Sequence, residues 1–270
     1  MHYLDEGRGL PVVMLHGNPT WSFFYRNLVG ALKESRRVIV PDHIGCGLSD
    51  KPDDRHYAYN LARRVEDLEM LLDHLDVRES VTLVLHDWGG MIGMAWAQRH
   101  PERVRRLVIL NSAAFHLPLG KRLPWSLWLV RNTPLGPLLV RGLNAFCLGA
   151  VRHCVVRPLE PAVRDTYLAP YNSWENRIAV LRFVQDIPLS RGDPSFDIVT
   201  EVQDGLHRLR RVPMLICWGQ RDFVFDADFL AEWRKRFPAA EVHTFRDAGH
   251  FVLEDAGADI VPLVREFVRA

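Results

Sequence analysis

The sequence has few cysteines, no strong excess of charge of either sign and no long unbroken apolar run. Its four cysteines form neither a CxxC pair nor a zinc-ligand spacing, which argues against a disulfide scaffold or a zinc module. A net charge of +1 provides no overall field that would recruit nucleic acid. The apolar stretch at residues 126–151 is broken by arginines, prolines and glycines, so we expect no transmembrane segment.

The start of the chain and the sparse cysteines also bear on location. Residues 1–9 lack the basic start and apolar centre of a signal peptide. Sparse cysteines are typical of a reducing compartment. We therefore expect a cytoplasmic protein, and no motif indicates a metal or any other cofactor.

What the sequence does contain is an alternation of short β-branched runs with helical patterns. This alternation is typical of the α/β class, in which a mostly parallel sheet is covered by helices. The length suits one large domain with an insertion. The expected strands are residues 1–5, 11–15, 37–40, 81–85, 107–110, 214–218 and 241–245, and the expected helices are residues 21–33, 60–75, 89–99, 227–237 and 258–268.

Residues 114–212 interrupt the alternation, because they contain aromatics, prolines and arginines but no convincing strand. We expect a helical cap and a return segment here, inserted into a core made of residues 1–113 and 213–270. An insertion after a strand's carboxyl end covers the place where ligands bind in such sheets. Sheets of this kind usually have a strand before the first one seen here, which suggests an incomplete N-terminus. We expect the cap to be inserted after the sixth strand.

The cap region is also the most basic part of the chain. Residues 114–193 carry ten Lys/Arg and five Asp/Glu, a balance of +5. This balance suggests contact with an acidic partner or with anionic lipid, although a solvated basic face is the simpler interpretation.

The strongest chemical motif is the apolar run 83–85 followed by His86-Asp87-Trp88-Gly89-Gly90. A buried strand leading into a glycine-containing turn and a helix is the context of a nucleophile elbow, which exposes one side chain above the sheet. That position holds Asp87, and no Gly-x-Ser-x-Gly occurs, so a serine esterase is not expected. A carboxylate nucleophile suits attack on an sp3 carbon. The alternative is that Asp87 only caps the next helix.

A histidine and a second carboxylate follow in the order that this fold uses. His250 lies after the last expected strand, in Ala248-Gly249-His250, and Asp222 follows the preceding strand. A histidine that acts as a base needs a third group to orient its ring, and we predict that Asp222 does so.

Residues that follow the second expected strand complete the candidate catalytic site. Gly17 allows the chain to turn so that the backbone N–H of Asn18 faces the nucleophile, together with the N–H of Trp88. The Asn18 amide and the Trp88 indole then remain as side-chain donors for an anionic leaving group. Both could instead be satisfied inside the core.

These motifs resemble the haloalkane dehalogenases, a family with the α/β-hydrolase fold. The resemblance covers nearly the whole chain and includes residues 16–21 (HGNPTW), 86–90 (HDWGG) and 248–250 (AGH). It implies that Asp87 is alkylated, that Asn18 and Trp88 hold the leaving group, and that His250 acts with Asp222. Leu85 departs from the elbow glycine of serine enzymes.

The cap resembles a narrower group, the bacterial β-lactone decarboxylases of long-chain olefin biosynthesis. The likeness lies in residues 170–178 (PYNSWENRI), 182–190 (RFVQDIPLS) and 251–255 (FVLED). It implies that a cis-β-lactone is converted to an alkene and CO2, and that a lactone-synthetase partner supplies the substrate. A hydrophobic small molecule then binds to cap residues, for which we predict Trp125, Trp128, Phe146 and Tyr171.

Three other functions remain open. Haloalkane dehalogenation uses the same residues, and epoxide hydrolysis would need tyrosine acids, for which Tyr167 and Tyr171 are available. A non-catalytic scaffold is the third, and the presence of Asp87, Asp222 and His250 argues against it.

Overall fold

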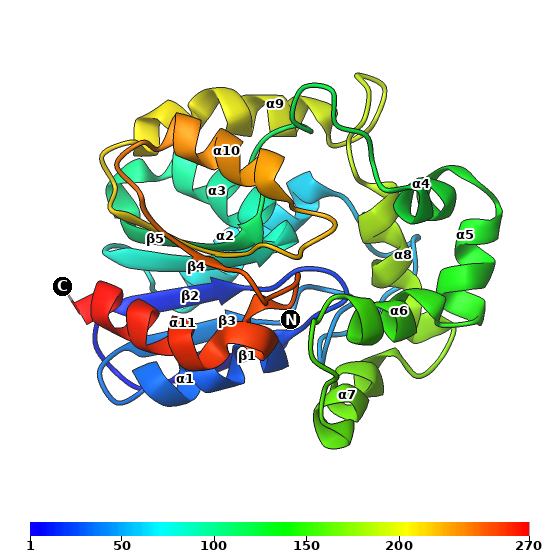
Figure 1. The fold of residues 1–270 in the computed structure, drawn as a ribbon, viewed down its shortest axis with the longest axis horizontal. Coiled ribbons are helices and arrows are strands. Elements are labelled where there is room, and N and C mark those ends of the chain that lie inside the picture. The colour runs from blue at the N-terminus through cyan, green and yellow to red at the C-terminus, as the bar shows by residue number, and fades with distance from the viewer. Residues whose placement is uncertain (270) are drawn as a thin grey trace.

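A seven-stranded sheet forms the centre of the computed structural model, which describes residues 1–269 (Figure 1). The strand order is β1-β3-β2-β4-β5-β6-β7. Strand β1 runs antiparallel to β3, and all other neighbouring strands are parallel. The strands are β1 (Tyr3–Glu6), β2 (Pro11–Leu15), β3 (Arg37–Pro41), β4 (Val81–Asp87), β5 (Val104–Ser112), β6 (Met214–Gly219) and β7 (Glu241–Phe245).

The central strands are apolar on both faces because helices cover both sides of the sheet. In β2, Val13 and Leu15 point to one hydrophobic cluster, and Val12 and Met14 point to the other. One face packs against α2 (Leu61–His74), α3 (Trp88–Arg99), α9 (Phe196–Gly205) and α10 (Ala227–Arg236), and the opposite face against α1 (Arg26–Leu32) and α11 (Val252–Arg269) (Figure 1).

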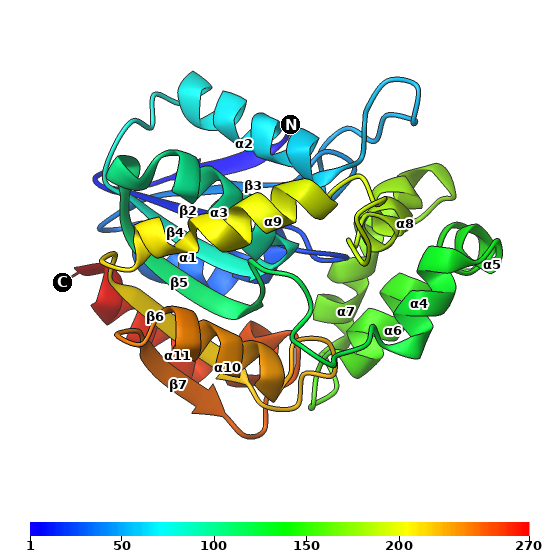
Figure 2. The ribbon, with the colours of Figure 1, turned by 90° about the horizontal axis from the view of Figure 1, so that it is seen from above.

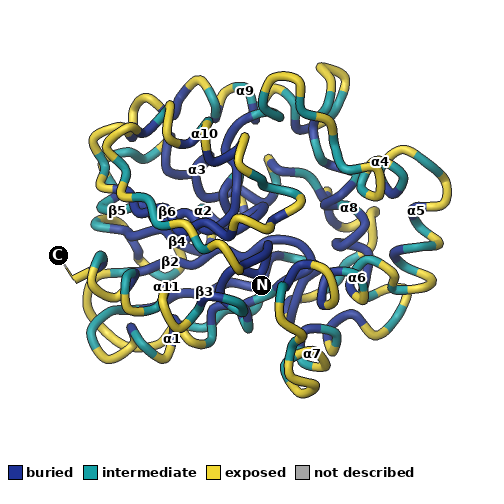
Figure 3. Tube along the Cα trace, in the orientation of Figure 1, coloured by how far each residue is buried: buried dark blue, intermediate teal, exposed yellow. Residues whose placement is uncertain are grey.

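The segment between β5 and β6 begins with short helices that lie beyond one end of the sheet (Figure 2). These cap helices are α4 (Trp125–Asn132), α5 (Leu135–Pro137), η3 (Leu138–Gly142), α6 (Ala145–His153), α7 (Pro161–Leu168), η4 (Ala169–Tyr171), η5 (Glu175–Arg177) and α8 (Ile178–Gln185). Helix α9 then returns to the core, beside α3. The outer turns of the cap are exposed, whereas the central strands of the sheet are buried (Figure 3).

The α/β-hydrolase fold expected from the sequence is confirmed, with its mostly parallel sheet and its cap helices. In the described part of the chain, residues 1–269, the cap follows the fifth strand, β5, so the expected position after the sixth strand was wrong. The expected domain boundaries at residues 113/114 and 212/213 stay a prediction.

Several elements differ from their expected bounds for local reasons. The helix expected at residues 21–33 is a 3-10 turn, η1 (Ser22–Tyr25), followed by α1. Helix α11 starts six residues earlier than residue 258, because two helical segments join across a kink at Ala256 (φ −124°). Val252 and Leu253 are buried by this extra turn.

Candidate active site

Asp87 occupies a sharp bend between β4 and α3. Its backbone has φ 50° and ψ −125°, an unfavourable conformation for a residue with a side chain. Its carboxylate makes no capping hydrogen bond to α3, so the structure does not support the capping alternative. The bend is tight because a Cβ on Gly89 would lie 2.0 Å from the backbone oxygen of Leu15.

The carboxylate of Asp87 is buried and fixed by the β2 loop. The backbone N–H of Asn18 donates to Oδ1 at 2.7 Å. Gly17 permits this contact, since a Cβ at that position would lie 2.0 Å from the same oxygen. The N–H of Asn18 thus faces the nucleophile, as the sequence predicted.

Burial is the largest influence on the pKa of Asp87 and raises it above the ordinary value. The imidazole of His250 and the backbone N–H groups of Asn18 and Trp88 act in the opposite direction without cancelling the effect of burial. Asp87 is therefore a desolvated carboxyl group, and desolvation makes the ionised form of such a group a stronger nucleophile than a hydrated one.

His250 lies between Asp87 and Asp222. Its Nε2 is 3.6 Å from Oδ2 of Asp87, and its Nδ1 is 2.8 Å from Oδ2 of Asp222. Burial lowers the pKa of His250, but the two carboxylates outweigh this effect and the net pKa is raised. The structure brings the three residues together in the arrangement of nucleophile, imidazole and orienting acid.

Asp222 is oriented by its own hydrogen bonds. The backbone N–H groups of Val224 and Phe225 donate to its Oδ1 at 2.7 and 3.1 Å. The side chain of Asn111, at the end of β5, donates to its Oδ2 at 3.0 Å and also bonds both backbone groups of Gly219. Asn111 was missed in the sequence, where the only signal is a polar residue directly after a buried apolar run.

Both predicted side-chain donors line the cavity above Asp87. The Asn18 amide donates to the backbone oxygen of Val180 at 3.0 Å, and an amide has a second N–H. The indole of Trp88 packs against Phe183, with ring centroids 5.4 Å apart. Asn18 and Trp88 thus lie together beside Asp87, with one amide hydrogen of Asn18 already bound by the cap, and their role as a donor pair for the leaving group stays a prediction.

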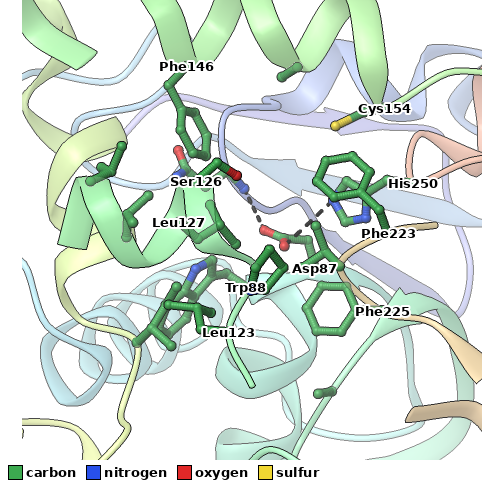
Figure 4. A pocket seen from close by; sticks show the side chains of 18 of the residues that line it. Asp87, Trp88, Leu123, Ser126, Leu127, Phe146, Cys154, Phe223, Phe225 and His250 are labelled. Carbon is green, nitrogen blue, oxygen red and sulfur yellow. Dashed lines mark hydrogen bonds and ion pairs between the residues drawn. The ribbon is translucent and has the colours of Figure 1, made fainter. Parts of the chain in front are cut away.

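The cavity between core and cap has a volume of about 400 Å³ and mostly apolar walls. Leu127 and Phe146 lie on one side of the Asp87 carboxylate, and Phe223 and Phe225 lie on the other (Figure 4). Such a cavity suits an alkyl-substituted ligand with a single reactive centre.

The four predicted cap residues divide into two pairs. Trp125 and Phe146 line the cavity. The predictions for Trp128 and Tyr171 were wrong. Trp128 faces outward on α4 and is 52% exposed, whereas Tyr171 is buried within the cap and donates to the backbone oxygen of Thr20 at 3.3 Å.

The tyrosines that epoxide hydrolysis would need are also absent from the cavity wall. The hydroxyl of Tyr167 donates to Glu254, on the far side of the His250 loop, and Tyr171 lies in the cap interior. Neither hydroxyl is available to protonate an epoxide oxygen.

One further carboxylate connects the cap to the loop that carries His250. Asp255 accepts the backbone N–H of Gly249 at 2.8 Å. It also accepts those of Val156 and Arg157, the residues after α6, at 2.9 and 3.1 Å. The sequence indicated only a cluster of acidic residues after His250, so this role was not predicted.

The described chain, residues 1–269, offers neither a metal site nor a membrane-spanning helix. No group of three or more His, Cys, Asp or Glu side chains is arranged to hold a metal ion in this part of the chain. Nor is any described helix both long and apolar enough to cross a bilayer.

The site combines a mostly parallel sheet, an aspartate at the turn between β4 and α3, and a helical cap above that turn, which together are typical of α/β-hydrolase-fold enzymes. The chain belongs to the α/β-hydrolase fold family, whose model matches residues 11–257. The aspartate at the nucleophile position and the similarities below make it haloalkane dehalogenase-like.

Two curated relatives are similar over almost the full chain. The chain is 57% identical over 269 residues to a cis-3-alkyl-4-alkyloxetan-2-one decarboxylase of Shewanella oneidensis, covering 99% of this chain and 85% of the relative. It is 49% identical to a protein of the same name from Xanthomonas campestris pv. campestris, covering 99% and 92%. The crystal structure of the haloalkane dehalogenase DatA from Agrobacterium tumefaciens C58 has a TM-score of 0.88 at 27% identity, covering 99% of this chain and 92% of that one. The resemblance inferred from the motifs is confirmed.

Proposed function

We propose that the chain is a cis-3-alkyl-4-alkyloxetan-2-one decarboxylase, which converts a cis-β-lactone with two alkyl substituents into an alkene and CO2. The observation that carries this assignment is the 57% identity over 99% of the chain, which includes the cap as well as the core. The apolar cavity above Asp87 supports it, because both substituents of such a lactone are alkyl groups.

In the proposed first step, the Asp87 carboxylate attacks the β-carbon, the ring carbon bonded to the ring oxygen and to one alkyl chain. A carbon–oxygen ester bond forms, and the ring carbon–oxygen bond breaks. The released oxygen becomes part of a carboxylate. The free N–H of the Asn18 amide and the indole N–H of Trp88 are the donors for this new anion.

In the second step the bond between the neighbouring ring carbon, the α-carbon, and the carboxylate breaks, and CO2 leaves. The electron pair of the broken carbon–carbon bond forms the alkene, while the ester bond to Asp87 breaks and the Asp87 carboxylate is regenerated. The sequence of steps consumes no water, proton or oxidant, which fits a largely apolar cavity. The proposed role of His250, held by Asp222, is to balance the charge of Asp87 as it is released.

The assignment is tested by product analysis with a synthetic cis-3,4-dialkyl β-lactone and a 1-bromoalkane assayed in parallel. We expect alkene and CO2 from the lactone with the wild type, and none with Asp87→Asn. Asp247→Asn is the matched control, because Asp247 is exposed, pairs with Arg221 and lies near His250 in sequence. It should turn over lactone like the wild type.

Haloalkane dehalogenation is the second candidate, because Asp87, His250, Asp222, Asn18 and Trp88 also suit that reaction and the fold matches DatA. Release of bromide at enzymatic rates without alkene from the lactone would establish it and reject the decarboxylase.

We also propose that the enzyme works in the cytoplasm and receives its lactone from a synthetase partner. All four cysteines are buried free thiols, which suits a reducing compartment. A strained, poorly water-soluble lactone favours transfer between neighbouring enzymes. Co-purification with a lactone-forming enzyme from the native host tests this proposal, and its consistent absence would reject it.

A further inference from the structure

The exposed large apolar side chains of the molecule are concentrated on the cap. Seven of the twelve lie within residues 119–148, although this segment is a small part of the chain. Soluble monomers rarely gather exposed apolar residues in this way unless the surface contacts something. We call these seven the cap face: Leu119, Trp125, Trp128, Leu135, Leu138, Leu143 and Leu148.

Most of the cap face lies on neighbouring helices at one end of the molecule. Trp125 and Trp128 are one turn apart on α4, which packs against α5. Helix α5 continues into η3, and η3 contacts α6, which carries Leu148. Figures 1 and 2 both place α4, α5 and α6 together at the edge farthest from the C-terminus.

The charge of the same segment has only one sign. Residues 114–159 contain six Lys/Arg and no Asp or Glu. Lys121 and Arg131 pair with carboxylates outside the segment. Arg122, Arg152 and Arg157 are exposed and form no ion pair with any residue of the described chain. Unpaired arginines and exposed Trp and Leu in one stretch of sequence that contains no acid are typical of a surface that binds anionic bilayers.

The mouth of the cavity opens beside this face. Trp125 is 78% exposed and also lines the cavity, as does Phe223, which is 48% exposed. Arg122 is exposed and lines the cavity as well. A ligand that enters between α4 and the loop after β6 therefore passes the aromatic and basic residues of the cap.

We propose that the cap face docks on the surface of an anionic lipid bilayer, so that the mouth of the cavity opens toward the acyl chains of the lipids. Trp125 and Trp128 insert at the level of the headgroups, and Arg122, Arg152 and Arg157 contact lipid phosphates. Docking of this kind does not depend on which apolar substrate the enzyme uses, so it stands apart from the proposed reaction. It delivers an alkyl-substituted ligand to Asp87 without passage through water.

The test is flotation of the full chain with vesicles of phosphatidylcholine alone or mixed with phosphatidylglycerol. The cap variants are Trp128→Ser with Leu148→Ser, which removes apolar surface outside the cavity wall, and Arg152→Glu. Matched controls on the core are Met70→Ser, an exposed apolar residue of α2, and Arg210→Glu, an exposed arginine. Thermal melting verifies that each variant is folded.

We expect the wild type to float with the anionic vesicles and to leave them at high salt. Both cap variants should bind at least about tenfold more weakly, whereas both controls should bind like the wild type. Failure of the wild type to bind, or equal losses in cap and control variants, would overturn the proposal. So would an oligomer of the wild type that ignores vesicles and dissociates in the cap variants, because the face would then be a protein interface.

Discussion

At the scale of single residues, Asp87 combines an unfavourable backbone conformation with a buried carboxylate. The bend could be inferred from the sequence, since a glycine pair after an apolar strand predicts it and places Asp87 in the turn. The hydrogen bond from Asn111 to Asp222 could not be predicted, because the two residues are far apart in the sequence and no local pattern connects them.

The raised pKa of Asp87 predicts that Asp87→Asn is inactive yet more stable than the wild type at pH 7. Because the folded-state pKa lies above the unfolded value of about 3.9, ionisation of this carboxyl lowers stability at every pH above that value. Lactone turnover should fall by at least about 10³-fold, since the nucleophile is lost. The melting temperature should rise.

Thermal unfolding across pH checks the sign of this effect. The advantage of Asp87→Asn should shrink as the pH falls toward about 4, where the wild-type carboxyl becomes protonated in both states. If Asp87→Asn is less stable than the wild type at pH 7, the charge of Asp87 stabilises the fold and the prediction is wrong.

At the scale of elements, the sequence predicted the strands better than the cap. Buried parallel strands are short apolar runs, and β2 and β7 have the expected bounds. The cap helices are short and irregular, and no periodicity separates an inward aromatic such as Phe146 from an outward one such as Trp128. Trp128 and Tyr171 were therefore misplaced, since their environments depend on how the cap helices pack together.

Two glycine substitutions, one at the junction of β4 and α3 and one inside α1, should have opposite effects on stability. Gly89→Ala should destabilise the protein by about 1–3 kcal/mol or more, because its Cβ would overlap the backbone oxygen of Leu15. Gly30→Ala, inside α1 where a Cβ meets nothing within 4 Å, should stabilise it by about 0.5–1 kcal/mol. Urea unfolding measures both, and equal effects would mean that the bend is not tightly packed.

At the scale of the whole molecule, a buried ion pair connects the core to the end of the cap. Arg64 of α2 donates to Asp186, the residue after α8, at 3.4 Å, and it lies over the ring of Phe183. Burial raises the pKa of Asp186 to about 6, against the opposing charge of Arg64. Ser195 donates to the other carboxylate oxygen at 2.6 Å. No pattern in the sequence predicts the pairing of Arg64 with Asp186, because the two residues are 122 positions apart.

This pair predicts strong non-additivity. Arg64→Met or Asp186→Leu alone should lower the free energy of unfolding by about 3–5 kcal/mol, because each leaves one buried charge without its partner. The double variant should lie much nearer the wild type, since both charges are gone. Urea unfolding of the four proteins gives the coupling energy, and additive losses would mean that the two charges do not interact.

Asp255 couples the position of the cap to the loop that carries His250, because it accepts backbone hydrogen bonds from both segments. Its carboxylate clamps the segment after α6 to Gly249, which immediately precedes His250 in the chain. The backbone N–H of Phe251 also donates to the oxygen of Cys154 at 2.7 Å, so the residues on both sides of His250 are bound to the end of α6. Chimaeras that exchange caps between relatives must preserve these hydrogen bonds, because a donor cap seated at another angle would pull the imidazole out of line with the nucleophile.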